Sequence, residues 1–409
     1  MSVAPRSPSF GAIAAADLAS DERLAELFVE AVARGYWGNG NLAALEFWCL
    51  AEKALQDDTL GTPGRLFHAL VKAGDLSRVT DAQEARALAR MPGGAREALA
   101  LRASGAAAPP APAPEVDAEA LFGPSPVGFQ HSVMMMCFLP QKRLPPGERS
   151  YATRHGRAAL SVEAGSLANP ENVGEIRRCA VPFGSRARMV VPYVNACAVR
   201  NRGPEVDLGR SLRDFLARLG ISFDGRRGKA VAEQVEAVAA ASIVLGQWAD
   251  DRAVTSAGRI ANQVTFWMAR DAAERLVWEP SMRLSDDYYA ALAERPVPVD
   301  MRHLAKLARS PRRMDLYAWL AYRTARIPAG REVHVPAESL RAVFAPDIAA
   351  PRLFRHRLAA DLGAVAAVYR DFRVRLEGDR LVLERSRPPV DRDGIAELVP
   401  APRRRGRGK

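Results

Sequence analysis

The side chains best suited to chemistry in this sequence are cations at the start of an expected helix. Arg226, Arg227 and Lys229 open this helix, close together in the chain. A phosphate binds well in such a place, because guanidinium and ammonium groups donate to its oxygens and a helix N-terminus favours an anion. Gln234, on the expected outward face, can pair with an adenine edge. The run therefore predicts a helix that binds DNA, with an ordinary exposed helix face as the alternative.

A second cluster of basic side chains lies on a helix expected over 352–369. Arg352, Arg355 and His356 share its outward face, and no acidic residue interrupts this stripe until Asp361. Arginine forks bind both phosphates and guanine edges. The stripe is therefore the stronger candidate for reading DNA bases, and a solvated basic face is the alternative.

Four further arginines are placed to contact the DNA backbone from extended segments. One pair lies in the loop between strands expected at 243–248 and 264–269, and the other lies on one face of a hairpin expected at 372–385. Such segments act as wings that position a protein on the phosphates. The predicted wing contacts are Arg252, Arg259, Arg373 and Arg375. Arg186 and Arg188 begin an earlier long helix, where a phosphate contact and a structural role both stay open.

Three kinds of catalytic or metal site do not fit the sequence. Tyr288 and Tyr289 could serve as the nucleophile of a rolling-circle nuclease, but no H-x-H motif accompanies them to hold a metal. The segment GRRGK resembles a P-loop, but Phe223 stands where the first glycine is needed and Ala230 replaces the Ser or Thr. The cysteines lack the C-x-x-C spacing of a zinc site. We expect a non-enzymatic protein without metal or cofactor.

The elements that carry these cations follow a similar order twice. Each run contains helices, a basic third helix and a closing hairpin, which is typical of a winged-helix domain whose third helix enters the major groove. We predict an α+β fold, mainly helical, with two tandem winged-helix domains preceded by a small all-helical N-terminal domain. The predicted boundaries are 1–19 for a disordered N-terminus, 20–103 for the helical N-terminal domain, 104–122 for an Ala/Pro linker, 123–277 for the first winged-helix domain, 278–387 for the second, and 388–409 for a flexible basic tail.

Several local predictions accompany these domains. The apolar run 133–140 is expected to be a strand, and residues 151–165 are expected to be a hairpin. The segment 296–308 is expected to contain a helix. Thr62 is expected to cap a helix that begins at Pro63, because proline fits the first helical position.

The charge distribution places the anion-binding surface after residue 120. The chain has 409 residues, with 58 Lys+Arg against 47 Asp+Glu and a net charge of +11. Up to Ala120 the net charge is −5, so the remainder carries +16. Nucleic acid is the expected partner, because no stretch is apolar enough to span a membrane and the N-terminus lacks an apolar secretory core. We expect a cytoplasmic protein.

Four motifs in the chain resemble the RepA-type plasmid replication initiators. They are VPFGSRAR at 181–188, VDLGRSLRDFLARLG at 206–220, the GK pair at 228–229 and MDLYAWLAYR at 314–323. The resemblance covers about 134–386 and implies winged-helix units that recognise repeated sites in double-stranded DNA of the plasmid origin. It further implies that the protein helps to open the duplex, recruits a host replicative helicase or initiator, and forms a homodimer in one of its states.

Two other functions stay open beside the initiator that we predict. A winged-helix transcriptional regulator without initiator activity would bind a single palindrome rather than several head-to-tail repeats. An enzyme that acts on DNA, such as a nickase or primase, would act on supercoiled origin DNA in the presence of Mg²⁺.

Overall fold

The computed structural model describes most of the chain outside its two ends and one long internal stretch. The described residues are 13–33, 37, 41–56, 62–73, 76, 79–91, 126–169, 172, 174–221, 225–249, 251–265, 280–294 and 296–390. The predicted linker and nearly all of the predicted basic tail lie outside them. The chain is α+β, as predicted.

Contacts divide the chain into two compact units, and each unit joins segments that are far apart in the sequence. Among the described residues, unit one comprises 13–91, Glu332–Gly363 and Val374–Leu383. Unit two comprises 126–331, Ala364–Arg373 and the residues from Glu384 to Val390. The N-terminal helices therefore share a unit with residues that follow them by more than two hundred positions.

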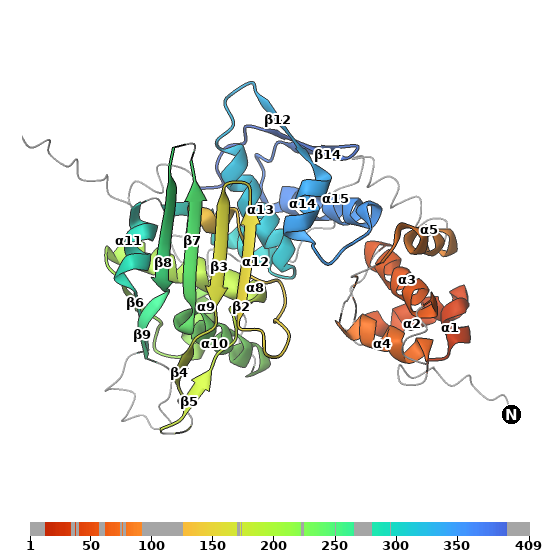
Figure 1. Ribbon diagram of the computed structural model, residues 1–409, viewed down its shortest axis with the longest axis horizontal. Helices are drawn as coiled ribbons and strands as arrows, with labels where there is room; N and C mark the ends of the chain where they lie inside the picture. Colours follow the sequence, from red (N-terminus) through yellow and green to blue (C-terminus); the bar gives the residue numbers. More distant parts are fainter. Residues whose placement is uncertain are drawn as a thin grey trace, which may run out of the picture. The chain divides into compact units, whose positions relative to one another are not determined.

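The N-terminal part of unit one is built from helices (Figure 1). They are α1 Ala15–Ala19, α2 Asp21–Ala33, α3 Asn41–Gln56, α4 Pro63–Ala73 and α5 Asp81–Arg90. Aromatic rings fill the core, where the ring centroids of Phe47 and Phe67 lie 4.9 Å apart and Phe28 contacts Phe47 and Trp48. The start of α4 at Pro63 confirms the prediction from the proline.

Helix α1 lies inside the segment that we predicted to be disordered. The Asp17 carboxylate accepts a hydrogen bond from the Ala14 N–H at 2.8 Å, and Leu18 is fully buried. A capped turn that buries a leucine is ordered, because the cap satisfies a free N–H and the burial offsets the lost chain entropy. The disordered N-terminus that we predicted to extend to residue 19 is therefore wrong from Ala15 onward.

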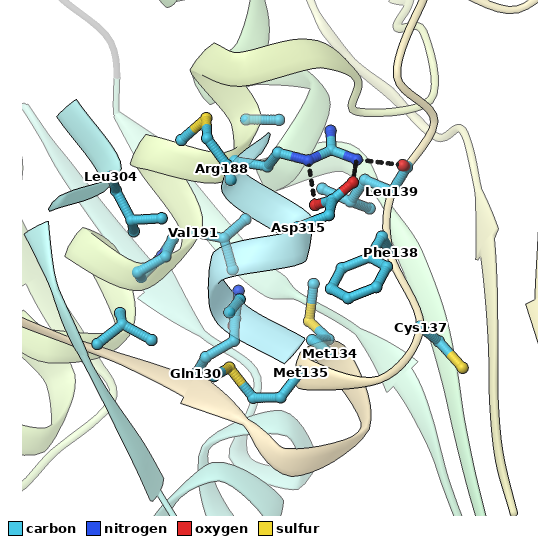
Figure 2. Close-up of a pocket in the computed structure, with 15 residues that line it drawn as sticks. Gln130, Met134, Met135, Cys137, Phe138, Leu139, Arg188, Val191, Leu304 and Asp315 are labelled. Carbon is cyan, nitrogen blue, oxygen red and sulfur yellow. Dashed lines mark hydrogen bonds and ion pairs between the residues drawn. The ribbon is translucent and has the colours of Figure 1, made fainter. Parts of the chain in front are cut away.

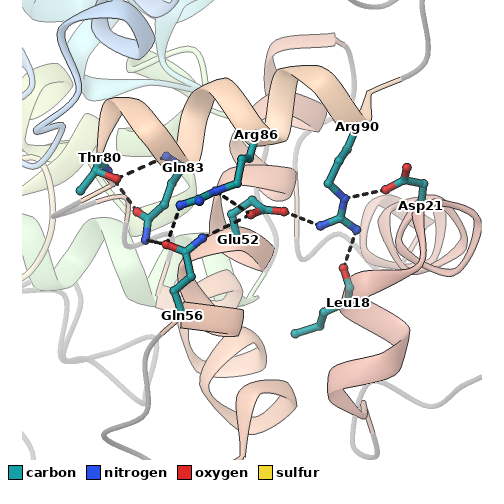
Figure 3. Close-up of polar contacts among 8 residues, drawn as sticks. All are labelled: Leu18, Asp21, Glu52, Gln56, Thr80, Gln83, Arg86 and Arg90. Carbon is teal, nitrogen blue, oxygen red and sulfur yellow. Dashed lines mark hydrogen bonds and ion pairs between the residues drawn. The ribbon is translucent and has the colours of Figure 1, made fainter.

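Polar contacts tie α5 to the other N-terminal helices (Figure 3). The Arg90 guanidinium donates to Asp21 on α2 at 2.7 Å, to Glu52 on α3 at 2.5 Å and to the Leu18 carbonyl on α1 at 2.6 Å. At its other end, α5 is capped by Thr80, whose Oγ1 accepts from the Gln83 N–H. Because one arginine joins three helices, the N-terminal helices behave as one packed module.

The C-terminal part of unit one is a small sheet with helices. Its elements are β12 Glu332–Pro336, α14 Ala337–Phe344, α15 Pro351–Val368, β13 Val374–Glu377 and β14 Arg380–Glu384, with α15 continuing into unit two. The sheet order is β12-β14-β13. The β13–β14 hairpin turns at Gly378, where φ is 59°, as the EGD turn predicts. On α15, Phe354, Leu358 and Leu362 are buried, as predicted.

Unit two contains several small sheets (Figure 1). A four-stranded antiparallel sheet has the order β2-β3-β7-β8, from β2 Ser150–His155, β3 Ala158–Glu163, β7 Ser242–Trp248 and β8 Ala253–Arg259. A three-stranded sheet has the order β6-β10-β9, from β6 Glu205–Asp207, β10 Ser281–Leu284 and β9 Ala261–Thr265. Two pairs complete the strands, β1 Val127–His131 with β11 Pro296–Asp300, and β4 Ser166–Ala168 with β5 Ile176–Arg178.

The α-helices of unit two include the long buried helix α8, Gly184–Asn201. The others are α9 Leu212–Arg218, α10 Gly225–Ala240, α11 Asp286–Glu294, α12 Met301–Leu307 and α13 Pro311–Thr324. The C-terminal half of α10 is almost entirely buried, from Val238 to Ala240. Both α8 and α10 therefore contribute to the core of unit two.

A similar order of elements occurs twice along the chain. The first run is α8, β6, α9, α10, β9 and β10, with β7 and β8 inserted after α10, and the second is α13, β12, α14, α15, β13 and β14. In both runs the last strand lies between the other two in the sheet. A repeat of helices and strands is therefore observed, with α10 and α15 as third helices. It differs from the predicted one, because β10, which we assigned to the second domain, pairs with β6 and β9 of the first run, and β7 pairs with β8 instead of with the strand expected at 264–269.

Three local predictions are wrong. Residues 132–135 form the 3-10 helix η2 rather than part of a strand, because an unbroken apolar run does not distinguish a buried strand from a buried turn. The expected wing loop after β7 is mostly strand β8, whose small side chains hid its strand character. The first residues of the expected helix at 296–308 form β11, which pairs with β1 before α12 begins. The hairpin predicted at 151–165 is confirmed by β2 and β3.

Among the residues that the structure describes, no helix combines the length and the apolar character that a membrane crossing requires.

Candidate nucleic-acid interface

Helix α10 presents cations at its first turn. The helix begins at Gly225, so the basic run lies within the helix rather than in a turn before it. Arg227 and Lys229 are exposed there, whereas the side chain of Arg226 lies outside the described residues. The opposite face is buried through Val231, Val235 and Val238, as predicted. The start of α10 is therefore a positive, accessible surface that suits an anion.

Gln234 does not lie on the outward face of α10, which corrects its predicted placement. Its side chain is buried, and its Oε1 accepts a hydrogen bond from the Phe183 N–H at 2.8 Å. The neighbouring small residues Ala237, Ala239 and Ala240 are buried as well. Because α10 packs on more than one side, its accessible face is narrower than a single apolar stripe suggests.

The rest of the accessible face of α10 is acidic and already paired. The Glu233 carboxylate contacts Arg143, and the Glu236 carboxylate contacts Arg177. Both acids would repel a phosphate in the absence of these arginines. The positive potential of α10 is therefore concentrated at its first turn.

Helix α15 keeps part of its basic stripe accessible. Arg352 is exposed and Arg355 is half-buried, and both lie away from the side of the helix that carries Phe354 and Leu358. Two arginines one turn apart on a helix surface are neighbours that can contact the same ligand. This pair matches its predicted outward placement.

His356 is buried, which corrects its predicted outward placement. Its Nε2 lies 4.0 Å from Oε1 of Glu84 on α5, and both side chains are almost without solvent contact. The next residue, Arg357, contacts Glu46 on α3 through a 3.0 Å ion pair. This flank of α15 therefore faces the N-terminal helices of unit one rather than solvent.

The Glu84 carboxyl has an unusual proton affinity. Burial raises its pKa to about 7, against the lowering effect of the Arg352 guanidinium. Arg355 also favours the ionised form, and Asp81 disfavours it. Burial therefore outweighs the nearby arginines and favours the neutral form of the Glu84 carboxyl over the anion.

The four predicted wing arginines are exposed, and they lie on different elements. Arg252 lies at the turn between β7 and β8, whereas Arg259 lies at the far end of β8, opposite Ser242. Their separation along a seven-residue strand is about 20 Å, so they cannot form one site. Arg373 precedes β13, and Arg375 is held by ion pairs with Glu332 at 2.9 Å and Glu377 at 2.6 Å. Contact of these four arginines with the DNA backbone stays a prediction.

Comparison with known proteins gives one family match. Residues 181–337 match the family of the plasmid-encoded RepA protein. The resemblance predicted from the sequence is thereby confirmed for a stretch that contains α8, α10, α13 and the β7–β8 hairpin. Helix α15 and the N-terminal helices lie outside it.

Two crystal structures of RctB are similar to part of the chain. A selenomethionine form of RctB domains 2 and 3 has a TM-score of 0.38 at 11% identity, covering 64% of this chain and 94% of that one. A second structure of domains 2–3 has a TM-score of 0.35 at 8% identity, covering 61% and 95%. No curated protein matches the chain in sequence.

Within the segment that matches the RepA family, Arg188 has a structural role. Its guanidinium donates to both carboxylate oxygens of Asp315 on α13, at 2.6 and 2.7 Å, and to the Leu139 carbonyl at 2.5 Å (Figure 2). Burial raises the pKa of Asp315 to about 6, against the effect of Arg188. The adjoining cavity holds about 30 Å³, which has room for water but not for a nucleotide. Of the two arginines that begin α8, only Arg186 is exposed.

One of the two tyrosines considered as nucleophiles, Tyr288, lies in the core. Tyr288 is buried, its hydroxyl contacts Asn195 Oδ1 at 3.2 Å, and burial raises its pKa to about 12. In the described parts of the chain, no group of three or more His, Cys, Asp or Glu side chains is arranged to hold a metal ion.

The sequence interpretation missed the acidic residues that contact α15. Glu84 lies on the same face of α5 as Ala87 and Leu88, and all three are buried. Glu46 lies within the buried stretch of α3 that starts at Leu45. An acidic side chain on an apolar helix face is a signal that sequence reasoning can use, because burying a charge requires a partner.

Proposed function

We propose that this protein is a plasmid replication initiator that binds repeated sites in the double-stranded DNA of its origin. The match of residues 181–337 to the family of the plasmid-encoded RepA protein supports this role. The proposal treats the two runs of elements as winged helices. In it, α10 and α15 are the helices that contact DNA, and the two hairpins contact the backbone.

The observation that carries the proposal is the position of accessible cations on the third helix of each run. Arg227 and Lys229 occupy the first turn of α10, and Arg352 and Arg355 occupy the first turns of α15. A helix start with exposed cations combines side-chain charge with free N–H groups, so it favours phosphate. Finding this combination at the same place in both runs favours DNA over an unspecific anion.

The proposal extends to what the bound protein does. It helps to open the duplex and recruits a host replicative helicase or initiator, and a homodimer is one of its states. It acts without a catalytic site, metal or cofactor of its own. If the two helices and their hairpins neutralise six to ten phosphates, affinity falls by roughly a thousandfold or more between 50 and 200 mM salt.

Footprinting on the DNA that flanks the gene tests the proposal. We expect several head-to-tail protected repeats, and we expect a plasmid that carries them to replicate only when the protein is supplied. A single protected palindrome on DNA that does not support replication would instead identify a transcriptional regulator.

Incubation with supercoiled origin DNA and Mg²⁺ tests the absence of catalysis. We expect no nicked product and no covalent adduct. A protein–DNA adduct would show that the protein is an enzyme, and mapping the attached residue would identify its nucleophile.

A further inference from the structure

The four-stranded sheet β2-β3-β7-β8 of unit two has one side that is open to solvent (Figure 1). Residues directly opposite each other in an antiparallel sheet point to the same side. On one side Leu160 and Leu245 are buried, and α11 contacts β8 there. The residues that alternate with these form the other side, which we call the open sheet face. One row across it runs through Arg154, Ala159, Gly246 and Thr255, from β2 to β8.

The open sheet face carries an exposed tryptophan at one end. Trp248 is the last residue of β7, and 45% of its surface is exposed. A methyl group placed on Gly246 would lie 3.1 Å from a carbon of the indole, so the ring lies over this glycine. The missing side chain at Gly246 therefore makes room for the indole, and part of the ring surface stays open to a ligand.

Small side chains occupy the middle of the open sheet face. The row that follows the one of Gly246 runs through Ala152, Ser161, Val244 and Ala257, and none of these four residues is buried. Four strands span about 15 Å, and seven residues of strand extend over about 20 Å. A flat ligand a few rings long can therefore lie close to the strands.

Arginines surround the tryptophan. The Trp248 N–H donates to the carbonyl of Arg157 at 2.9 Å, so Arg157 lies beside it at the start of β3, and Arg252 lies at the turn after β7. Arg154 projects from the open sheet face on β2, and all three arginines are exposed. The described acids near this face are Asp251, at the same turn, and Glu163, at the opposite end of β3. The end that carries Trp248 is therefore positively charged.

An aromatic ring flanked by arginines fits single-stranded DNA. Bases stack on exposed aromatic side chains, while the guanidinium groups pair with the phosphates between them. In a duplex each base is already stacked between its neighbours, so its faces cannot reach the ring. The positive charge around Trp248 favours such a polyanion over the apolar surface of another protein.

We propose that the open sheet face binds single-stranded DNA, with a base stacked on Trp248 and neighbouring phosphates paired with Arg154 and Arg157. This inference rests on the proposed function, because a protein that opens its origin exposes single strands. The sheet holds one of the separated strands, and α10 and α15 contact the duplex.

The test uses the full chain and a fluorescent oligothymidine of 20 nucleotides, which cannot pair with itself. Binding is followed by anisotropy at low salt. We expect the wild type to bind and Trp248→Ala to bind about five- to a hundredfold more weakly, because a stacked base is lost. Trp248→Phe keeps a ring and should lose less. Equal affinities of the wild type and Trp248→Ala, or a wild type that does not bind, would overturn the inference.

Val254→Ala is the matched control for the tryptophan. Val254 is 50% exposed at the same end of the sheet, but it lies opposite Gln247 and therefore points to the other side. We expect this variant to bind the oligothymidine as the wild type does. An equal loss in Val254→Ala and Trp248→Ala would contradict a site on the open sheet face.

Arg154→Ala tests the phosphate contacts, with Arg178→Ala as its charge-matched control. Arg178 is exposed on β5, outside the four-stranded sheet. We expect Arg154→Ala to weaken oligothymidine binding by about two- to fivefold and to lower the slope of log affinity against log salt concentration by about 0.7 in magnitude. The same loss in Arg178→Ala would show a response to net charge alone and would contradict a contact at Arg154.

A measurement on the unaltered protein covers the case in which Trp248→Ala does not fold. Bromodeoxyuridine replaces thymidine in the oligonucleotide, and the peptides crosslinked by light are identified by mass spectrometry. We expect the crosslink in the peptide that contains Trp248. Crosslinks confined to peptides outside the four-stranded sheet would contradict the site.

Binding of the same proteins to duplex origin repeats separates this inference from the proposed function. We expect Trp248→Ala to bind the repeats as the wild type does. If the repeats are bound and oligothymidine binding does not depend on Trp248, only the inference is wrong. If no protein binds the repeats but oligothymidine binding depends on Trp248, the proposed function is wrong and the single-strand site stands. If Trp248→Ala loses only self-association, measured by light scattering, the open sheet face joins copies of the chain and the inference is wrong.

Discussion

Helices α10 and α15 hold the same place in the two runs, yet their polar sides contact different things. On α10, Glu233 and Glu236 pair with arginines of the same unit, and Gln234 turns inward to the start of α8. On α15, Arg352 and Arg355 stay accessible, while the flank of His356 faces acidic N-terminal helices. The position of a helix in a repeat thus determines its core face, whereas the remaining faces depend on which neighbours cover them.

The largest expected effect is a pH dependence of the unfolding free energy that arises beside α15 and has no counterpart at α10. Because the pKa of Glu84 is raised to about 7 in the folded protein, the stability contributed by its proton is fully present below about pH 4.3 and is lost as the pH rises through 7. The charges around it are Arg352, Arg355, Asp81 and, once protonated, His356. We expect the wild type to lose on the order of 3 kcal/mol of unfolding free energy over this window relative to Glu84→Gln.

Urea unfolding of both proteins at pH 5 and pH 8, followed by helical circular dichroism, measures this difference. Lys229→Ala, at the start of α10, serves as the reference and should follow the pH trend of the wild type. If Glu84→Gln shows the same trend as the wild type, the carboxyl is not buried against α15 in solution.

The next effect concerns base reading by α15. Arg355→Ala should weaken binding to the origin repeats by about 1–3 kcal/mol and weaken binding to random duplex less. Arg309→Ala, an exposed arginine that follows α12, is the matched control and should change neither affinity. Competition gel shifts with both duplexes give the two affinities. An equal loss of affinity for the origin repeats and for random duplex would show that Arg355 contacts phosphates and does not read bases.

A smaller effect tests the inward placement of Gln234 on α10. Gln234→Ala removes the acceptor of the Phe183 N–H, so the free energy of unfolding should fall by about 1–2 kcal/mol. The sequence preference for DNA should stay unchanged, because the side chain does not reach the surface. Thermal unfolding and a binding-site selection check the two parts. A changed base preference with an unchanged free energy of unfolding would show that the Gln234 side chain lies on the outward face of α10.

The smallest effect concerns the first turn of α10. Lys229→Ala should weaken binding to the origin repeats and to random duplex alike, by about two- to fivefold at moderate salt. The slope of log affinity against log salt concentration should fall in magnitude by about one. Salt titrations of both proteins on both duplexes provide the measurement. A selective loss on the origin repeats would mean that α10, like α15, reads bases.

The core faces of the DNA-contact candidates followed from the sequence. Val231 and Val235 on α10 and Phe354 and Leu358 on α15 recur at helical spacing, and they are buried. Their apolar periodicity is a local property, so a single sequence reveals it. The DNA contacts, the winged-helix description and the domain boundaries remain predictions.

The covered polar side chains could not be placed in the same way. Gln234 and His356 lie beside apolar stripes, and each is buried because a second element packs there. That element comes from a distant part of the sequence, so no spacing within the helix reveals it. The strand β8 was missed for a different reason, because AVTSAGR lacks the large side chains that mark a strand.

Unit one joins segments that are far apart in the sequence, so it can be completed only late in synthesis. The N-terminal helices leave the ribosome long before residues 332–363, which complete the same unit. Until then the buried face of α5 that carries Glu84 stays in contact with water, and a nascent chain in this state is open to chaperones and to wrong associations. The N-terminal helices are therefore made well before the segment that buries this face of α5.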